Sequence, residues 1–330
     1  MSPDLITQAA DLPAPSDEAV NAYAANRDAL KAHVDNALLD RTDLDSLIGS
    51  NRAMMRDNHA NHSLFMSNVF RAGQFVGLAR VVPWVYRAYR SHGFSYDYFP
   101  AELKAWIEAM QENLPAEAVE SLRPAYDWML SRHEQMINLA ESAEESSADP
   151  VWDDVAAPFL TALLHGRSSE FLELVRDFLG SEEDLPDFYA RAVHPALWRI
   201  GRLWESGEIS VAQEHLATSI VSRSMAAIYG RLNPPVPARG RALVASTPNE
   251  LHEIGSRMVA DLLELDGWEI TYLGANTPVA DLVRQAEQDP PDLVALSTAM
   301  PFNMDGVFEL TAAIRESPAL NDTSILVGGQ

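Results

Sequence analysis

The stretch RALVASTPNELHEIGSRMVADLL, residues 241–263, decides the fold of the second half of this chain. It joins a short apolar and β-branched run, residues 241–247, to a helical pattern that begins near His252 and continues to Leu265. The same alternation continues with strands at 268–274, 292–298 and 324–329 and helices at 279–287 and 305–316. Alternation at this spacing predicts parallel strands joined by right-handed crossovers, an open Rossmann-like α/β sheet.

The rest of the chain favours helices. Residues 151–232 contain four amphipathic patterns with short loops between them, which predict a four-helix bundle. Residues 1–140 predict an all-helical sensor domain, with one helix expected from Asp43 to Phe70. An acidic, serine-rich segment at 141–150 and a proline-rich segment at 233–240 are predicted linkers. We therefore expect a multidomain α and α/β protein whose last domain spans 241–330.

The charge and the cysteine count exclude several classes of function. The 330 residues carry 24 Lys plus Arg against 48 Asp plus Glu, a formal net charge of -24. A chain this acidic is repelled by phosphate backbones and anionic membranes, so we expect no direct DNA binding and no membrane partner. The absence of cysteine excludes a thiolate metal site and a thioether-linked chromophore. Without a basic leader or a long apolar run, the sequence predicts a cytoplasmic protein.

The loop after the first predicted strand carries Glu250-x-His252-x-x-Gly255. A histidine here lies at the carboxyl edge of the sheet, where ligands of such sheets bind. The acid two residues earlier can orient the imidazole, and the glycine lets a bulky ligand approach the backbone. Small residues follow the later strands: Ser297, Thr298, Gly328 and Gly329. Taken alone, the histidine could equally be a capping or surface residue.

Together these residues resemble the signature of the cobalamin-binding domain family, Asp/Glu-x-His-x-x-Gly followed by a serine-containing loop and a Gly-Gly pair. The resemblance covers roughly Pro150 to the chain end. It implies that His252 replaces the nucleotide base of cobalamin as the lower cobalt ligand. It also implies that the displaced base tail enters a slot lined by the Ser297-Thr298 and Gly328-Gly329 pairs. Relatives continue past the fourth strand, so the last domain is expected to be incomplete at its C-terminal end.

A second motif lies in the predicted bundle, where Trp204 is followed after nine residues by Glu214 and His215. This Trp-x9-Glu-His pattern is similar to that of the CarH-type light sensors. The similarity implies adenosylcobalamin with Trp204 over its upper face, contacts from Glu214 and His215 to the adenosyl group, and Val211 lining the pocket. Without it, Trp204 would be a core residue and the Glu-His pair a solvated helix start.

One position departs from that group. Its best-known members have a histidine directly after the tryptophan, and this histidine caps cobalt once light has expelled the adenosyl group. The residue here is Glu205. A bis-histidine light product is therefore not expected unless His194 or His215 supplies the second nitrogen. A product with water or with no strong upper ligand is the alternative.

Residues 80–99 concentrate aromatic and basic side chains in the first domain. Aromatic walls with guanidinium groups suit a flat conjugated ligand that bears carboxylates, although an aromatic core stripe with a solvated basic face gives the same pattern. A helical domain of this length ahead of the Trp-x9-Glu-His unit resembles the photocobilins, which implies a globin-like domain and noncovalent biliverdin. The candidate bilin-binding residues are Arg80, Trp84, Arg87, Arg90, His92 and Tyr96.

These resemblances imply a photoreceptor, and not an enzyme. Photolysis of the cobalt–carbon bond would change the arrangement of domains or of a homo-oligomer and so signal to a partner. The alternative is a corrinoid protein that carries a methyl group between methyltransferases. Two further alternatives are an antirepressor that uses cobalamin only as a structural ligand and an adaptor that binds no cobalamin.

Overall fold

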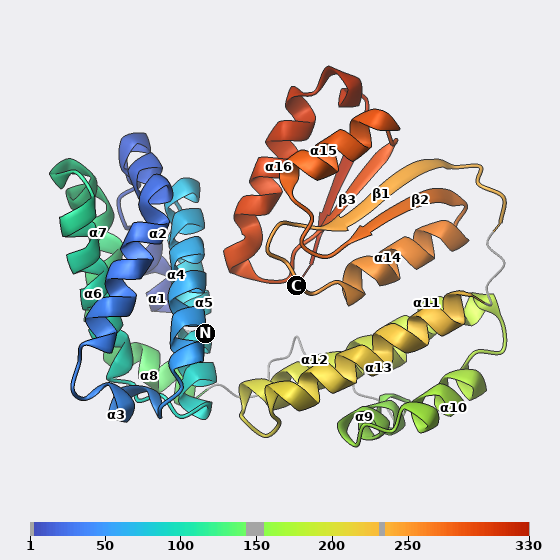
Figure 1. The fold of residues 1–330 in the computed structure, drawn as a ribbon, viewed down its shortest axis with the longest axis horizontal. Coiled ribbons are helices and arrows are strands. Elements are labelled where there is room, and N and C mark those ends of the chain that lie inside the picture. The colour runs from blue at the N-terminus through green and yellow to red at the C-terminus, as the bar shows by residue number, and fades with distance from the viewer. Residues whose placement is uncertain (1–2, 143–154, 231–234, 330) are drawn as a thin grey trace. The chain divides into compact units, whose positions relative to one another are not determined.

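The computed structural model describes residues 3–142, 155–230 and 235–329, without the side chain of Glu182. The chain divides into two compact units, Met1–Glu145 and Ser146–Gln330. Figure 1 gives the order of the elements along the chain. Most of the predicted linker at 141–150, and residues 233 and 234 of the second linker, lie outside the described residues.

Every element of regular secondary structure in the described residues of the first unit is a helix, as expected (Figure 1). Its helices are α1 (Pro3–Ala10), α2 (Asp17–Leu39), α3 (Leu44–Ile48), α4 (Arg52–Ala72), α5 (Val76–Ser91), α6 (Tyr98–Asn113), α7 (Ala116–Ser131) and α8 (His133–Glu141). One continuous apolar cluster fills its interior. Because each helix contributes buried residues from one face, the apolar faces of these amphipathic helices pack against one another within this unit.

The single helix expected from Asp43 to Phe70 is wrong, because the chain breaks between α3 and α4. Gly49 adopts a left-handed conformation with φ 55°, and Ser50 follows with φ 67°. A side-chain carbon at Gly49 would lie 2.9 Å from the carbonyl oxygen of Gly93. Since two backbone segments meet this closely, only glycine fits there, and the helix must end.

The second unit begins with the predicted bundle. Its helices are α9 (Ala156–Leu164), α10 (Ser168–Phe178), α11 (Leu185–Phe188), α12 (His194–Glu205) and α13 (Val211–Tyr229). A short 3-10 turn, η1 (Glu182–Asp184), precedes α11, and a π-helical segment, η2 (Tyr189–Val193), joins α11 to α12. The third predicted helix is therefore one continuous rod with a widened turn inside it. Helix α13 starts at a capping box, in which Ser210 and Gln213 satisfy each other's backbone N–H groups.

A four-stranded parallel sheet follows, with the strand order β2-β1-β3-β4. The strands are β1 (Gly240–Ser246), β2 (Trp268–Gly274), β3 (Leu293–Ser297) and β4 (Ser324–Gly328). The helices are α14 (Ile254–Leu265), α15 (Val279–Gln288) and α16 (Met304–Glu316), with 3-10 turns η3 (Pro301–Asn303) and η4 (Pro318–Leu320). The predicted open α/β sheet is confirmed.

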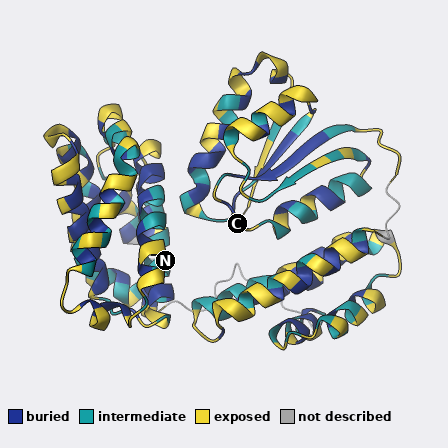
Figure 2. Ribbon diagram, viewed as in Figure 1, coloured by how far each residue is buried: buried dark blue, intermediate teal, exposed yellow. Residues whose placement is uncertain are grey.

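Helices cover both faces of this sheet, so its central strands are buried (Figure 2). Helices α15 and α16 pack on one face and α14 on the other. The outer side of α14 also contacts the bundle core through Ile254, Met258, Leu262 and Leu265. Helix α14 is thus shared by the bundle and the sheet. In the described part of the chain, no helix is long and apolar enough to cross a membrane.

Candidate functional site

The candidate site lies where β1 ends and α14 begins. Residues Ser246 and Thr247 are buried at the carboxyl end of β1, and the following loop turns through Asn249, which has φ 63°. This turn directs the Glu250 side chain into the protein and leaves His252 at the surface. The Glu250 side chain is 0% exposed, whereas that of His252 is 62% exposed.

Glu250 is a buried carboxylate with all of its partners donating to it. Its Oε1 accepts from the backbone N of His252 at 3.0 Å and lies 2.5 Å from His252 Nδ1. Its Oε2 accepts from the backbone N of Ala299 at 2.8 Å and of Met300 at 3.0 Å, and from Asn303 Nδ2 at 3.0 Å. Burial opposes ionisation, but these hydrogen bonds outweigh it and lower the pKa of Glu250 to about 2. The group is therefore an anion.

This anion orients His252. Because Nδ1 faces the carboxylate, Nε2 is the nitrogen left for a ligand, an arrangement that histidine ligands of metals commonly have. The hydrogen bond to Glu250 raises the pKa of His252, and the charge of Glu214 adds to this effect. An exposed imidazole held by a buried carboxylate would suit a nitrogen ligand to a metal such as cobalt.

The glycine of the same motif fits a bulky ligand beside it. Gly255 lies in the first turn of α14, is exposed, and a side-chain carbon added there would meet no atom within 4 Å. The protein's own packing therefore does not demand glycine at this position. An incoming group that lies against the start of α14 would use the space that a side chain would fill.

The residues predicted to line a slot lie at the neighbouring strand ends. Ser297 ends β3 and is half-buried, whereas Thr298 is buried and its hydroxyl lies 3.5 Å from Glu250 Oε2. Gly328 ends β4 with open space around it. Gly329 has φ 145°, and a side chain there would overlap the Thr298 carbonyl. Thr298 thus contributes to the Glu250 anchor and to a close backbone approach that requires glycine.

The bundle motif faces the same region. Val211 and His215, at the start of α13, have exposed side chains. Glu214 accepts from Thr218 Oγ1 at 2.9 Å and lies 2.6 Å from His215 Nδ1. The charge of Glu214 contributes to the raised pKa of His252, so these two side chains lie within electrostatic reach of each other. Trp204, near the end of α12, is partly buried against the bundle core.

The position after Trp204 is occupied by an ion-paired acid. Glu205 accepts from Arg202 at 2.9 Å, and the Arg202 guanidinium lies over the Trp198 ring, 5.5 Å from its centre. Glu205 is therefore held on α12 by its own helix.

Asn303 is the site residue that sequence reasoning missed. It lies in η3, after β3, and donates to Glu250 and to the Asn249 carbonyl oxygen at 3.2 Å. A polar residue that follows a buried strand at the carboxyl edge of a parallel sheet was the available signal.

The candidate bilin residues of the first unit are only partly grouped. Arg90 donates to the Phe94 carbonyl oxygen at 3.3 Å and lies over the Tyr96 ring. Trp84, Arg87 and His92 are half-buried on or just after α5. Arg80 is exposed and lies ten residues before Arg90 on the same helix, about 15 Å along its axis. The six residues are therefore spread over the length of α5 and the loop after it.

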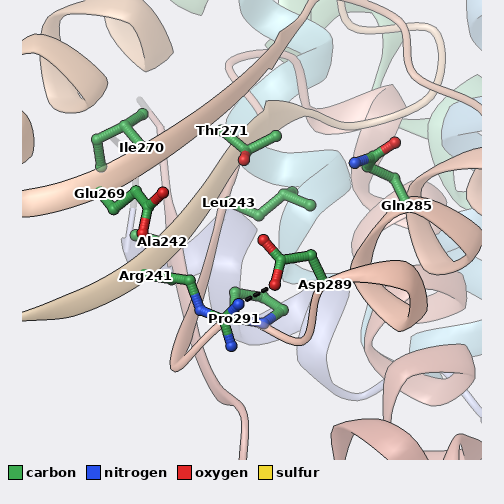
Figure 3. Close-up of a pocket in the computed structure, with 9 residues that line it drawn as sticks. All are labelled: Arg241, Ala242, Leu243, Glu269, Ile270, Thr271, Gln285, Asp289 and Pro291. Atoms are coloured by element: carbon green, nitrogen blue, oxygen red, sulfur yellow. Dashed lines mark hydrogen bonds and ion pairs between the residues drawn. The ribbon is translucent and has the colours of Figure 1, made fainter.

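A small pocket of about 70 Å³ lies elsewhere on the sheet (Figure 3). Its lining residues include Arg241 and Glu269, at the starts of β1 and β2, and Asp289, just after α15. Arg241 and Asp289 form an ion pair across it. This is the amino edge of the sheet, opposite the edge at which parallel sheets bind ligands.

Both parts of the second unit that carry candidate site residues match known protein families. Residues 155–229 and residues 240–330 match two families that are each described as B12 binding domain. The second unit carries cobalamin-binding domains. The first match covers the bundle, and the second covers the sheet.

Curated relatives fall into two groups. The chain is 40% identical over 89 residues to the HTH-type transcriptional repressor CarA of Myxococcus xanthus, covering 27% of this chain and 31% of that protein. It is 36% identical over 104 residues to the HTH-type transcriptional repressor CarH of the same organism, covering 32% and 34%. It is 19% identical over 160 residues to trimethylamine corrinoid protein 1 of Methanosarcina acetivorans, covering 48% and 74%. The chain thus spans about a third of the length of the first two.

Proposed function

We propose that this chain is a light-responsive regulator that holds adenosylcobalamin base-off between the bundle and the sheet, with His252 on cobalt. The observation that carries the proposal is the exposed His252 imidazole, which the buried Glu250 carboxylate holds by Nδ1 beside the open space at Gly255. The charge of Glu214 on the bundle reaches this imidazole. A carrier that exchanges methyl groups needs an open upper face, which Trp204 and the Glu214-His215 pair would obstruct. The identities of 40% and 36% to CarA and CarH over partial stretches support the same choice.

Each residue has a part in holding the ligand. Bound adenosylcobalamin would supply a cobalt–carbon bond that light breaks. Glu250 keeps the His252 imidazole in the tautomer that presents Nε2. The indole of Trp204 would shield the bound adenosyl group from water, and Glu214 would accept hydrogen bonds from ribose hydroxyls. Departure of the adenosyl group would leave Trp204 and the start of α13 without their contacts, which would favour a different bundle arrangement.

The decisive experiment uses the full chain loaded with adenosylcobalamin in the dark. We expect green light to change the absorption spectrum irreversibly and to shift the elution volume in size-exclusion chromatography. Trp204→Ala should speed bleaching several-fold, because the upper face is then open. A loaded protein whose spectrum and elution volume survive illumination would overturn the proposal.

A second candidate is a corrinoid protein that passes a methyl group between methyltransferases. The observation in its favour is the match to trimethylamine corrinoid protein 1, which extends over 160 residues. The chain would then bind methylcobalamin and turn it over with a methyl donor and acceptor. Methylcobalamin turnover together with an unchanged elution volume after illumination would favour this candidate.

Biliverdin in the first unit, a homo-oligomer that changes with light, and signalling without direct DNA contact belong to the same proposal. The grouping of Arg90 with Tyr96 supports only one end of a bilin site. The test is bilin absorption that stays with the protein after unbound biliverdin is removed by gel filtration, with Arg90→Ala expected to weaken it.

A further inference from the structure

Two tyrosine–carboxylate bonds fasten the bundle to helix α14. Tyr189 donates to Asp261 Oδ2 at 2.5 Å, and both residues are buried. Tyr229, the last residue of α13, donates to Glu264 Oε2. Burial raises the pKa of Asp261, and the bond from Tyr189 works against this shift. Since a buried carboxyl group without a partner is costly, Tyr189 fixes where α14 can lie against the bundle.

Both bonds lie at one end of the three helices concerned. Tyr189 in η2 precedes Trp204 by about 22 Å along the rod that η2 and α12 form, and Tyr229 follows Glu214 by about 22 Å along α13. Helix α14 starts just after His252, and Asp261 lies about 10 Å further along it. The η2–α12 rod, α13 and α14 therefore each have a residue of the candidate site toward one end and a tyrosine–carboxylate bond toward the other.

The two ends differ in packing. At the site end, apolar side chains stay open to solvent: Val211 is 50%, Leu216 47% and Leu251 71% exposed. At the bonded end, Tyr189 and its neighbours Ala192 and Val193 are buried in the bundle core. Opening the site end would give up the contacts of Ile254 and Met258 with the bundle core, whereas those of Leu262 and Leu265 at the bonded end would remain.

The π-helical segment adds to this asymmetry. Residues Tyr189–Val193 form a widened turn directly at the tyrosine that bonds to α14. One extra residue in a turn rotates everything after it by about 100°, so this segment decides which side of α12 Trp204 occupies. Anchoring Tyr189 thereby fixes the direction in which Trp204 points.

We infer that the Tyr189–Asp261 and Tyr229–Glu264 bonds are a hinge that pins the bundle to α14, so that the site end opens to admit cobalamin while the pinned end stays closed. The tyrosines act as positioning residues, which touch no ligand and set the separation between Trp204 and His252. This inference rests on the proposed cobalamin site between the bundle and the sheet.

Hydrogen–deuterium exchange on the full chain, with and without hydroxocobalamin, tests the hinge. Without the ligand we expect residues 210–216 and 250–255 to exchange at least tenfold faster than residues 188–193 and 258–265. Hydroxocobalamin should slow only the first two segments. In Tyr189→Phe, exchange at 188–193 should rise at least tenfold without ligand, and the dissociation constant for hydroxocobalamin should rise about tenfold. The absorption spectrum of the saturated complex should stay that of the wild type, because His252 is untouched.

Tyr272→Phe is the matched control. The Tyr272 hydroxyl donates to the Glu253 carbonyl oxygen at 3.2 Å, so it meets the start of α14 from the sheet side and not from the bundle. An equal rise in exchange at 188–193 in this control would overturn the inference, as would a Tyr189→Phe dissociation constant within twofold of wild type. Equal protection of both ends by hydroxocobalamin would overturn it as well. Wild-type protein that fails to bind hydroxocobalamin would instead refute the proposed site. Hydrogen exchange in ligand-free Tyr189→Phe would still show whether the Tyr189–Asp261 bond holds the bundle to α14.

Discussion

Two glutamates, one in each unit, are equally buried, but their pKa values are shifted in opposite directions. Glu102 in α6 has a side chain only 3% exposed, and Glu250 has one that is 0% exposed. Burial raises the pKa of Glu102, although the charge of His59 and a hydrogen bond from Trp106 Nε1 at 3.0 Å oppose the shift. The pKa of Glu250 is instead lowered to about 2.

The neighbours explain the difference. Glu250 receives two backbone N–H groups and an amide from the loop after β3, besides the groups of His252, and none of the loop donors can titrate. Next to Glu102 lies His62, with its Nδ1 3.7 Å away and a pKa that burial lowers to about 3. His62 is therefore neutral at physiological pH. The number of hydrogen-bond donors, and not the depth of burial, therefore decides in which direction the pKa of each of these two carboxyl groups is shifted.

The largest effect is expected for Glu250→Ala. The loop donors at Ala299, Met300 and Asn303 then lose their acceptor, which should lower the unfolding free energy by about 3 to 5 kcal/mol. The hydroxocobalamin dissociation constant should rise on the order of 100-fold, because His252 loses its orienting partner. Urea unfolding and absorbance titration measure the two effects. The exposed Glu269→Ala on β2 should change stability by less than about 0.5 kcal/mol; a similar loss in both variants would contradict the anchor.

Asn303→Ala should give a smaller loss of the same kind. One of the loop donors disappears while the carboxylate keeps the others, so stability should fall by about 1 to 2 kcal/mol. The hydroxocobalamin dissociation constant should rise about tenfold. The exposed Asn321→Ala serves as the control. Unchanged affinity in Asn303→Ala would show that the backbone donors alone hold Glu250.

Glu102→Gln should have the smallest effect and the opposite sign. A carboxyl group whose pKa is raised on folding gives stability below its unfolded value of 4.5, and this contribution is lost as the pH rises through the folded value. The variant should therefore be more stable than wild type by about 1 kcal/mol at pH 8, with the gain fading below pH 4.5. Hydrogen exchange of α6 at several pH values measures this. The exposed Glu108→Gln in the same helix is the control, and a variant less stable than wild type at pH 8 would refute the assignment.

The sequence predicted the parts of the molecule that depend on neighbours along the chain. Strand and helix alternation after residue 240 follows from hydrophobic periodicity, and the Glu250–His252 contact joins residues two apart. The predicted continuous helix across Gly49 was wrong because its break depends on a residue that is distant along the chain. This residue is Gly93, which lies 44 positions further along the chain and approaches only after folding.

The sequence by itself determined the open α/β sheet, the helical remainder and the exposed histidine after β1, because local hydrogen bonding and side-chain periodicity encode them. Only the tertiary structure decided what holds that histidine. Strand order β2-β1-β3-β4 brings the ends of β1 and β3 together, and so places donors from residues 299–303 on Glu250. It likewise decided that α14 is shared with the bundle through Tyr189 and Tyr229. Such contacts join residues 35 to 72 positions apart, and no local pattern records them.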